Sequence, residues 1–212
     1  MTSSFYPSQG PSTDQGWPIG DVVLLIHTLN DGLYRFWSQA DGWAPKAASE
    51  LMSKSRLDRQ VSLSRSLRHW TSTSPESLED GDLILGWANL GSLIEGSVKL
   101  FLSVFYEDYK SDLDTLKKTQ AWHAKKGKLL DPDGLALDVL IDYCEKAALF
   151  DIDDLKLFRL VQIRRNAIHS FKDRPIGNGD EFYGALKAYL KCLRAINERL
   201  PYPDSDYRPR ER

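Results

Sequence analysis

The segment from residue 78 to residue 109 constrains the fold most, because it is long and apolar on most sides. Its polar residues fall in one narrow arc of a helical wheel: Ser92, Glu95, Lys99 and Ser103. A helix of this kind is covered by other elements on most of its surface. The segment therefore predicts a long central helix inside an all-α protein.

The rest of the chain shows the same helical period, and no segment alternates apolar and polar residues as a half-buried strand requires. We expect a single all-α domain over residues 19–200, built as an up-and-down bundle of about five to six helices. Residues 1–18 and 201–212 are expected to be tails, the first of them disordered. The predicted helices span about residues 21–40, 45–69, 78–109, 135–150, 151–171 and 180–200.

Composition and charge exclude several classes of protein. Cys144 and Cys192 have no further thiol or histidine at ligand spacing, which argues against a disulfide framework or a metal site. The chain shows neither a basic leader nor a run of about 20 apolar residues, so we expect a cytoplasmic protein without a membrane partner. A net charge of −2 gives no global attraction to nucleic acid, so RNA would need a local basic patch.

One short stretch, residues 163–171, carries the groups that phosphoryl transfer needs. His169 follows two arginines and an asparagine there, and on an ideal helix Arg165 and Asn166 both neighbour its imidazole. Histidine can take and give a proton near neutral pH, and a guanidinium matches the oxygens of a phosphate. In RNA the 2′-hydroxyl attacks the adjacent phosphate once a base removes its proton, without metal or cofactor. The stretch therefore indicates chemistry on RNA.

An arginine, four intervening residues and a histidine on a late helix of an all-helical bundle resemble the motif of the HEPN family. Arg164 and His169 have this spacing. Residues 90–101 resemble the long helix of HEPN domains, in which an acidic and a basic residue face the motif, here Glu95 and Lys99. The resemblance covers about residues 78–200, and it predicts an HEPN-like fold.

The resemblance also implies a function. Many HEPN domains are metal-independent endoribonucleases, often toxins or antiviral defence effectors, in which two protomers form a composite active site. For this chain it implies Arg164 and His169 as catalytic residues, a homodimer, and an antitoxin or a defence-system protein as a partner. Other members of the family only bind nucleotides, RNA or proteins, so a non-catalytic binding module is the main alternative.

The choice between the two arginines stays open at this point. The spacing of the motif selects Arg164, whereas an ideal helical wheel places Arg165 on the side of His169 and turns Arg164 inward among apolar residues. We therefore expect Arg165, Asn166 and Glu95 to support the site, with Glu95 or another carboxylate holding the inward arginine. A third interpretation is a structural helical adaptor, in which these cations only stabilise the carboxyl end of a helix.

A lysine-rich connection at residues 115–128 supports a role in RNA binding, although a solvated loop explains the same pattern. Its aromatic side chains could stack on bases while the lysines contact phosphates. Lys172 and Arg174 extend the positive charge beyond His169. The residues expected to bind RNA are Lys117, Lys118, Trp122, Lys125, Lys126 and Lys172.

Overall fold

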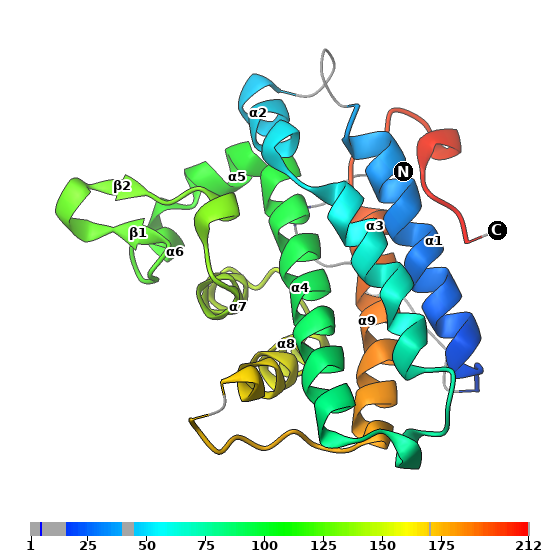
Figure 1. Ribbon diagram of the computed structural model, residues 1–212. Coiled ribbons are helices and arrows are strands. Elements are labelled where there is room, and N and C mark those ends of the chain that lie inside the picture. The colour runs from blue at the N-terminus through cyan, green and yellow to red at the C-terminus, as the bar shows by residue number, and fades with distance from the viewer. Residues whose placement is uncertain (1–4, 6–15, 40–44, 170, 212) are drawn as a thin grey trace.

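The structure is a computed structural model that describes Phe5 and residues 16–39, 45–169 and 171–211. The described residues form an all-α architecture with one short β-hairpin, which confirms the predicted fold class (Figure 1). None of their helices is long and apolar enough to cross a membrane. In chain order the elements are α1 (Ile19–Trp37), α2 (Lys46–Lys54), α3 (Leu57–Ser66), α4 (Asp80–Val104), α5 (Tyr106–Ser111), α6 (Leu113–Leu116), β1 (Trp122–His123), β2 (Lys128–Leu129), α7 (Leu137–Lys146), α8 (Ile152–Arg165) and α9 (Gly179–Arg199).

The central helix is α4, and α2, α3, α7, α8 and α9 all contact it. It begins with a capping box, in which the side chains of Glu79 and Asp82 each accept the backbone N–H of the other residue. These bonds satisfy donors that the first turn of a helix leaves unpaired. The prediction of a long helix packed on most sides is confirmed, and its fully buried side chains include Trp87, Leu90, Leu93, Ile94 and Phe101.

The predicted helix over residues 45–69 is two helices, so that prediction was wrong in detail. Ser55 is extended, with ψ at 144°, and Arg56 also leaves the helical conformation. The break lets α2 bury Met52 and α3 bury Leu57 and Gln60, while both helices contact α4. A continuous helix over residues 45–69 could not follow the two different directions of α2 and α3 (Figure 1).

The lysine-rich connection folds into a hairpin that the sequence did not predict. Trp122 pairs with Leu129 in the antiparallel register, and Gly127 closes the turn with a left-handed backbone, φ +60°. The hydroxyl of Tyr109 donates to the carbonyl of Leu130 at 2.7 Å and holds the base of the hairpin to α5. Each strand has two residues, which is too short for an alternating pattern to be visible.

The segment after α9 lies along α1, on the side of the molecule away from the hairpin (Figure 1). Tyr202 packs edge-on against Phe36, and Glu211 forms an ion pair with Arg194. Pro209 approaches Gly32 so closely that a Cβ at Gly32 would lie 2.6 Å from it. The described residues of this segment therefore pack on α1 and α9.

Candidate functional site

The helix that carries the Arg-His motif ends earlier than predicted. α8 begins at the N-cap Asp151, whose side chain accepts the N–H groups of Asp153 and Asp154, but it stops at Arg165 instead of continuing to Phe171. A tight 3₁₀ turn follows at Asn166–Ile168, and His169 is extended, with ψ at 96°. The expected one-turn relation between Arg165 and His169 is therefore wrong, because the two residues do not share an α-helix.

Arg164 is held on three sides. Its Nε and Nη2 donate to the two carboxylate oxygens of Glu181 at 2.7 and 3.0 Å, and its Nη1 donates to the carbonyl of Pro175 at 2.8 Å. Only 14% of the arginine side chain is exposed. Glu181 lies in the first turn of α9, where its N–H is capped by Asn178. The guanidinium thus joins the end of α8 to the start of α9 and to the loop between them.

Arg165 points to α4 and contacts Glu95. Its Nη1 lies 2.9 Å from Oε2 of Glu95, while Nζ of Lys99 lies 2.8 Å from the other oxygen. The arginine side chain crosses α4 at Gly91, where an added Cβ would lie 2.5 Å from its Cδ. Burial of the Glu95 carboxyl opposes its ionisation, but the hydrogen bonds from Lys99 and Arg165 outweigh burial and lower its pKa.

Each arginine thus has a carboxylate of its own. Glu181 holds Arg164, and Glu95 holds Arg165. Glu181 was missed by the sequence analysis, since nothing local connects it to the motif. The only signal is the Asn178-x-x-Glu181 pattern at a helix start, which indicates a cap and not a partner for an arginine.

His169 is exposed and belongs to a shallow surface hollow beside the end of α8. Ile168, Phe171, Lys172 and Arg174 line the hollow with it. Phe171 is fully exposed, and Ile168 is half exposed. The Nε of Arg174 is buried, yet it has no hydrogen-bond partner among the described residues. The hollow therefore combines an imidazole, two cations and two apolar side chains.

Asn166 starts the 3₁₀ turn that separates the arginines from His169. Its carbonyl accepts the backbone N–H of His169 at 3.3 Å. It is half-buried, and it acts through its backbone in the contacts that the structure describes. Asn166 therefore helps to set the position of the histidine.

The hairpin and the turn between α6 and β1 carry the other expected RNA-binding residues. Lys117, Lys118, Lys125 and Lys126 are exposed, and Nζ of Lys117 lies 5.7 Å from the centre of the half-buried Trp122 ring. Lys172 is separate from this group and lies in the hollow of His169. Figure 1 shows the hairpin projecting from the bundle, with α7 between it and α8.

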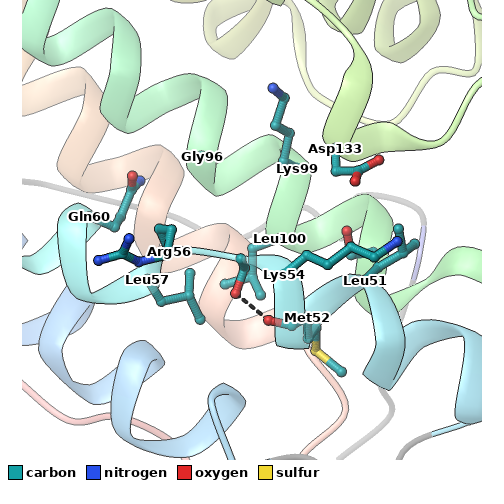
Figure 2. A pocket seen from close by; sticks show the side chains of 12 residues that line it. Leu51, Met52, Lys54, Arg56, Leu57, Gln60, Gly96, Lys99, Leu100 and Asp133 are labelled. Carbon is teal, nitrogen blue, oxygen red and sulfur yellow. Dashed lines mark hydrogen bonds between the residues drawn. The ribbon is translucent and has the colours of Figure 1, made fainter.

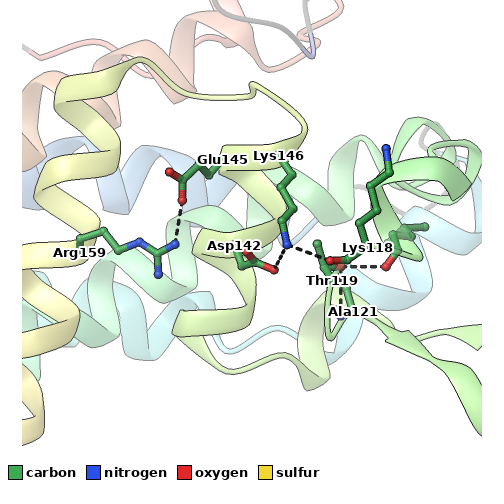
Figure 3. Close-up of polar contacts among 8 residues, drawn as sticks. Lys118, Thr119, Ala121, Asp142, Glu145, Lys146 and Arg159 are labelled. Carbon is green, nitrogen blue, oxygen red and sulfur yellow. Dashed lines mark hydrogen bonds and ion pairs between the residues drawn. The ribbon is translucent and has the colours of Figure 1, made fainter.

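Hydrogen bonds from α7 fix the root of this hairpin and the flank of α8 (Figure 3). Lys146 donates to the carbonyl of Lys118 at 2.8 Å and to Asp142 at 2.9 Å. On the other side of α7, Arg159 of α8 donates to Glu145 at 2.8 Å. The two basic regions are therefore attached to one helix.

Comparison of the chain with family models, with curated proteins and with solved structures finds no match.

Proposed function

We propose that this protein is a metal-independent endoribonuclease of the HEPN type, with His169 as the residue that transfers protons. The observation that carries the proposal is the surface hollow in which the exposed imidazole lies beside Lys172 and Arg174. Arg174 places a guanidinium at the hollow, and a guanidinium matches the oxygens of a phosphate.

In the proposed reaction, His169 removes the proton of a ribose 2′-hydroxyl. The 2′-oxygen then bonds to the adjacent phosphorus, the bond from phosphorus to the 5′-oxygen breaks, and a 2′,3′-cyclic phosphate remains. Lys172 and Arg174 stabilise the negative charge that grows on the phosphate oxygens. The departing 5′-oxygen takes a proton from a second acid, for which a second copy of His169 is available in a homodimer.

The contacts of Arg164 favour a positioning role for this residue. Its bonds to Glu181 and to the Pro175 carbonyl span both ends of the loop that carries the hollow. These bonds use three of the five N–H groups of the guanidinium, and only 14% of the side chain is exposed, so little of it is open to a phosphate. We therefore assign the phosphate to Lys172 and Arg174, and the loop geometry to Arg164.

Exposed apolar side chains at the end of α8 support the homodimer. Ile163, Ile168 and Phe171 are about half exposed or more, and they border the hollow or lie close to it in sequence. Contact between two such surfaces would bury them and bring two histidines together.

A second candidate is a non-catalytic module that binds a nucleotide, RNA or protein, including an antitoxin or defence-system partner. The observation that favours it is that Arg164 is engaged within the protein, since three of its five N–H groups donate to Glu181 and to the Pro175 carbonyl. In this case Arg164 would stabilise the loop, and the hollow would only bind.

The test is incubation of the purified protein with total RNA in EDTA, beside the His169→Ala variant. His69→Ala is the matched control, because His69 is exposed on a different part of the chain. The nuclease proposal predicts cleavage by the wild type and by His69→Ala, and none by His169→Ala. RNA binding without cleavage by the wild type supports the second candidate, and equal cleavage by His169→Ala contradicts the assigned role of His169.

A further inference from the structure

A second cavity lies along α4, where the junction of α2 and α3 meets the turn that follows the hairpin (Figure 2). It holds about 190 Å³. The buried side chains of Leu51, Met52 and Leu100 give it an apolar wall. Its volume is below the roughly 300 Å³ at which pockets for drug-sized molecules begin, so a ligand of one ring or a short chain fits it.

The charges around this cavity are mostly positive. Lys54, Arg56 and Lys99 line it against one carboxylate, Asp133. Arg56 is engaged by Asp58 through two hydrogen bonds of 2.8 and 2.6 Å. Lys54 has no carboxylate partner in the part of the chain that the structure describes, so its ammonium group is available to a ligand.

Lys99 connects the cavity to the candidate site. Its Nζ lies 2.8 Å from Oε1 of Glu95, and Oε2 of the same carboxylate holds Arg165. Lys99 is about one-quarter exposed, so its ammonium group is partly withdrawn from water but still reachable. Figure 2 shows the Lys99 side chain directed away from Leu51, Met52 and Leu100, so Lys99 would have to rotate and leave Glu95 to meet a negative group in the cavity. The two groups would therefore compete for Lys99.

We propose that this cavity binds a small organic anion that carries one compact apolar group, with the anion directed to Lys54 and Lys99. The apolar group lies on Leu51, Met52 and Leu100, where it is removed from water. We expect neither part of the ligand to suffice alone, because the side chains of Leu51, Met52 and Leu100 offer no donors and the cations are partly solvated. The inference does not depend on RNA cleavage.

The shared carboxylate gives the proposal a distinctive consequence. Replacing Glu95 by glutamine removes the negative charge that competes for Lys99, while the side chain keeps its shape. Anion affinity should then rise, although no residue that lines the cavity has changed. A cavity that bound ligands by apolar contact alone would not respond to this substitution.

The experiment is titration calorimetry of the full chain with phenyl phosphate, inorganic phosphate and phenol. The proposal predicts that phenyl phosphate binds in the millimolar range or tighter, and at least about fivefold more tightly than either fragment. Lys54→Met and Lys99→Met should each weaken phenyl phosphate about fivefold, and Glu95→Gln should tighten it by about threefold. Lys46→Met is the matched control, because Lys46 lies on the same helix as Lys54 but outside the cavity.

Ser103→Leu provides an independent check, because Ser103 lines the cavity and the larger side chain fills it. This variant should lose phenyl phosphate binding, and its thermal melt shows whether it is folded. Lys54 is exposed, so Lys54→Met keeps the test decisive even if Ser103→Leu does not fold. Absence of phenyl phosphate binding to the wild type, or equal affinity in the wild type, Lys54→Met and Lys99→Met, would overturn the proposal.

Discussion

The carboxylate of Glu181 accepts two hydrogen bonds from the guanidinium of Arg164, at 2.7 and 3.0 Å, and so ties α9 to the end of α8. The two residues are 17 positions apart, and the loop between them carries His169, Lys172 and Arg174. A fork-shaped donor on a carboxylate fixes orientation as well as distance. The proposed RNA site therefore depends on an ion pair that does not itself touch the substrate.

Removing this pair should destabilise the fold. Arg164→Ala leaves a partly buried carboxylate without its partner, and we expect a loss of about 2 kcal/mol in the free energy of unfolding. Arg164→Lys should recover little of it, because an ammonium cannot make the paired contact. Urea denaturation measures the change, with Lys156→Ala as the control, since the exposed Lys156–Asp153 pair should contribute less than about 0.5 kcal/mol. Equal losses in Arg164→Ala and Lys156→Ala would contradict the role given to Arg164.

Stability should fall as pH rises through the titration of Asp154. Burial, with repulsion from Asp151, raises the pKa of Asp154 from 3.8 to about 6, although Lys191, Cys192 and Arg199 oppose the shift. Between these two values the folded state keeps a proton that the unfolded state has lost, so stability decreases across this window and stays lower above it. The difference corresponds to at most about 3 kcal/mol.

The Asp154→Asn variant tests this pH dependence. It should be more stable than the wild type at pH 7 and should not show the decrease between pH 3.8 and about pH 6. Urea denaturation across this range measures both effects. Asp153→Asn, an exposed neighbour in the same turn, should follow the wild-type profile. A stability difference between the wild type and Asp154→Asn that stays constant across the window would show that the direction assigned to Asp154 is wrong.

The lysines of the hairpin should contribute to RNA affinity through phosphate contacts. Replacing Lys125 and Lys126 together by alanine should weaken binding of single-stranded RNA and lower the slope of log K against log salt by about 1.4. Filter binding at several salt concentrations measures the slope, and Lys46→Ala with Lys156→Ala gives a control of equal charge change on α2 and α8. An unchanged slope in the hairpin variant would show that these lysines do not contact the phosphates of the RNA.

Self-association should depend on Phe171. Replacing this fully exposed ring by serine removes apolar area from the proposed dimer surface without disturbing the core. We expect sedimentation to show fewer dimers, with little change in the melting temperature and a loss of RNA cleavage at low protein concentration. Leu24→Ser on α1 is the control, since Leu24 is exposed on another helix. Dimers that persist equally in both variants would place the interface elsewhere.

The sequence was sufficient to predict the all-α class and the central helix, because both depend on local periodicity. The apolar pattern that surrounds Leu90, Leu93 and Phe101 repeats at the helical period over many turns, and only a covered helix satisfies it. The break at Ser55 was not visible in the same way, since it depends on where α2 and α3 meet α4.

The geometry of the candidate site could not be predicted from residues 163–171 alone. A helical wheel assumes that the helix continues, yet α8 stops at Arg165. The carboxylates that pair with its two arginines come from α4 and α9. Glu95 and Glu181 lie 70 and 17 positions from their arginines. Contacts at such separations are decided by packing, and no local motif encodes them.

The identity of the RNA ends tests the central proposal most directly. Total RNA treated with the protein in EDTA should yield fragments whose 3′ ends are 2′,3′-cyclic phosphates by mass spectrometry, and His169→Ala should yield none. Fragments that end in a 3′-hydroxyl would contradict attack by the 2′-oxygen, and cyclic phosphates from His169→Ala at the wild-type rate would contradict proton transfer by His169.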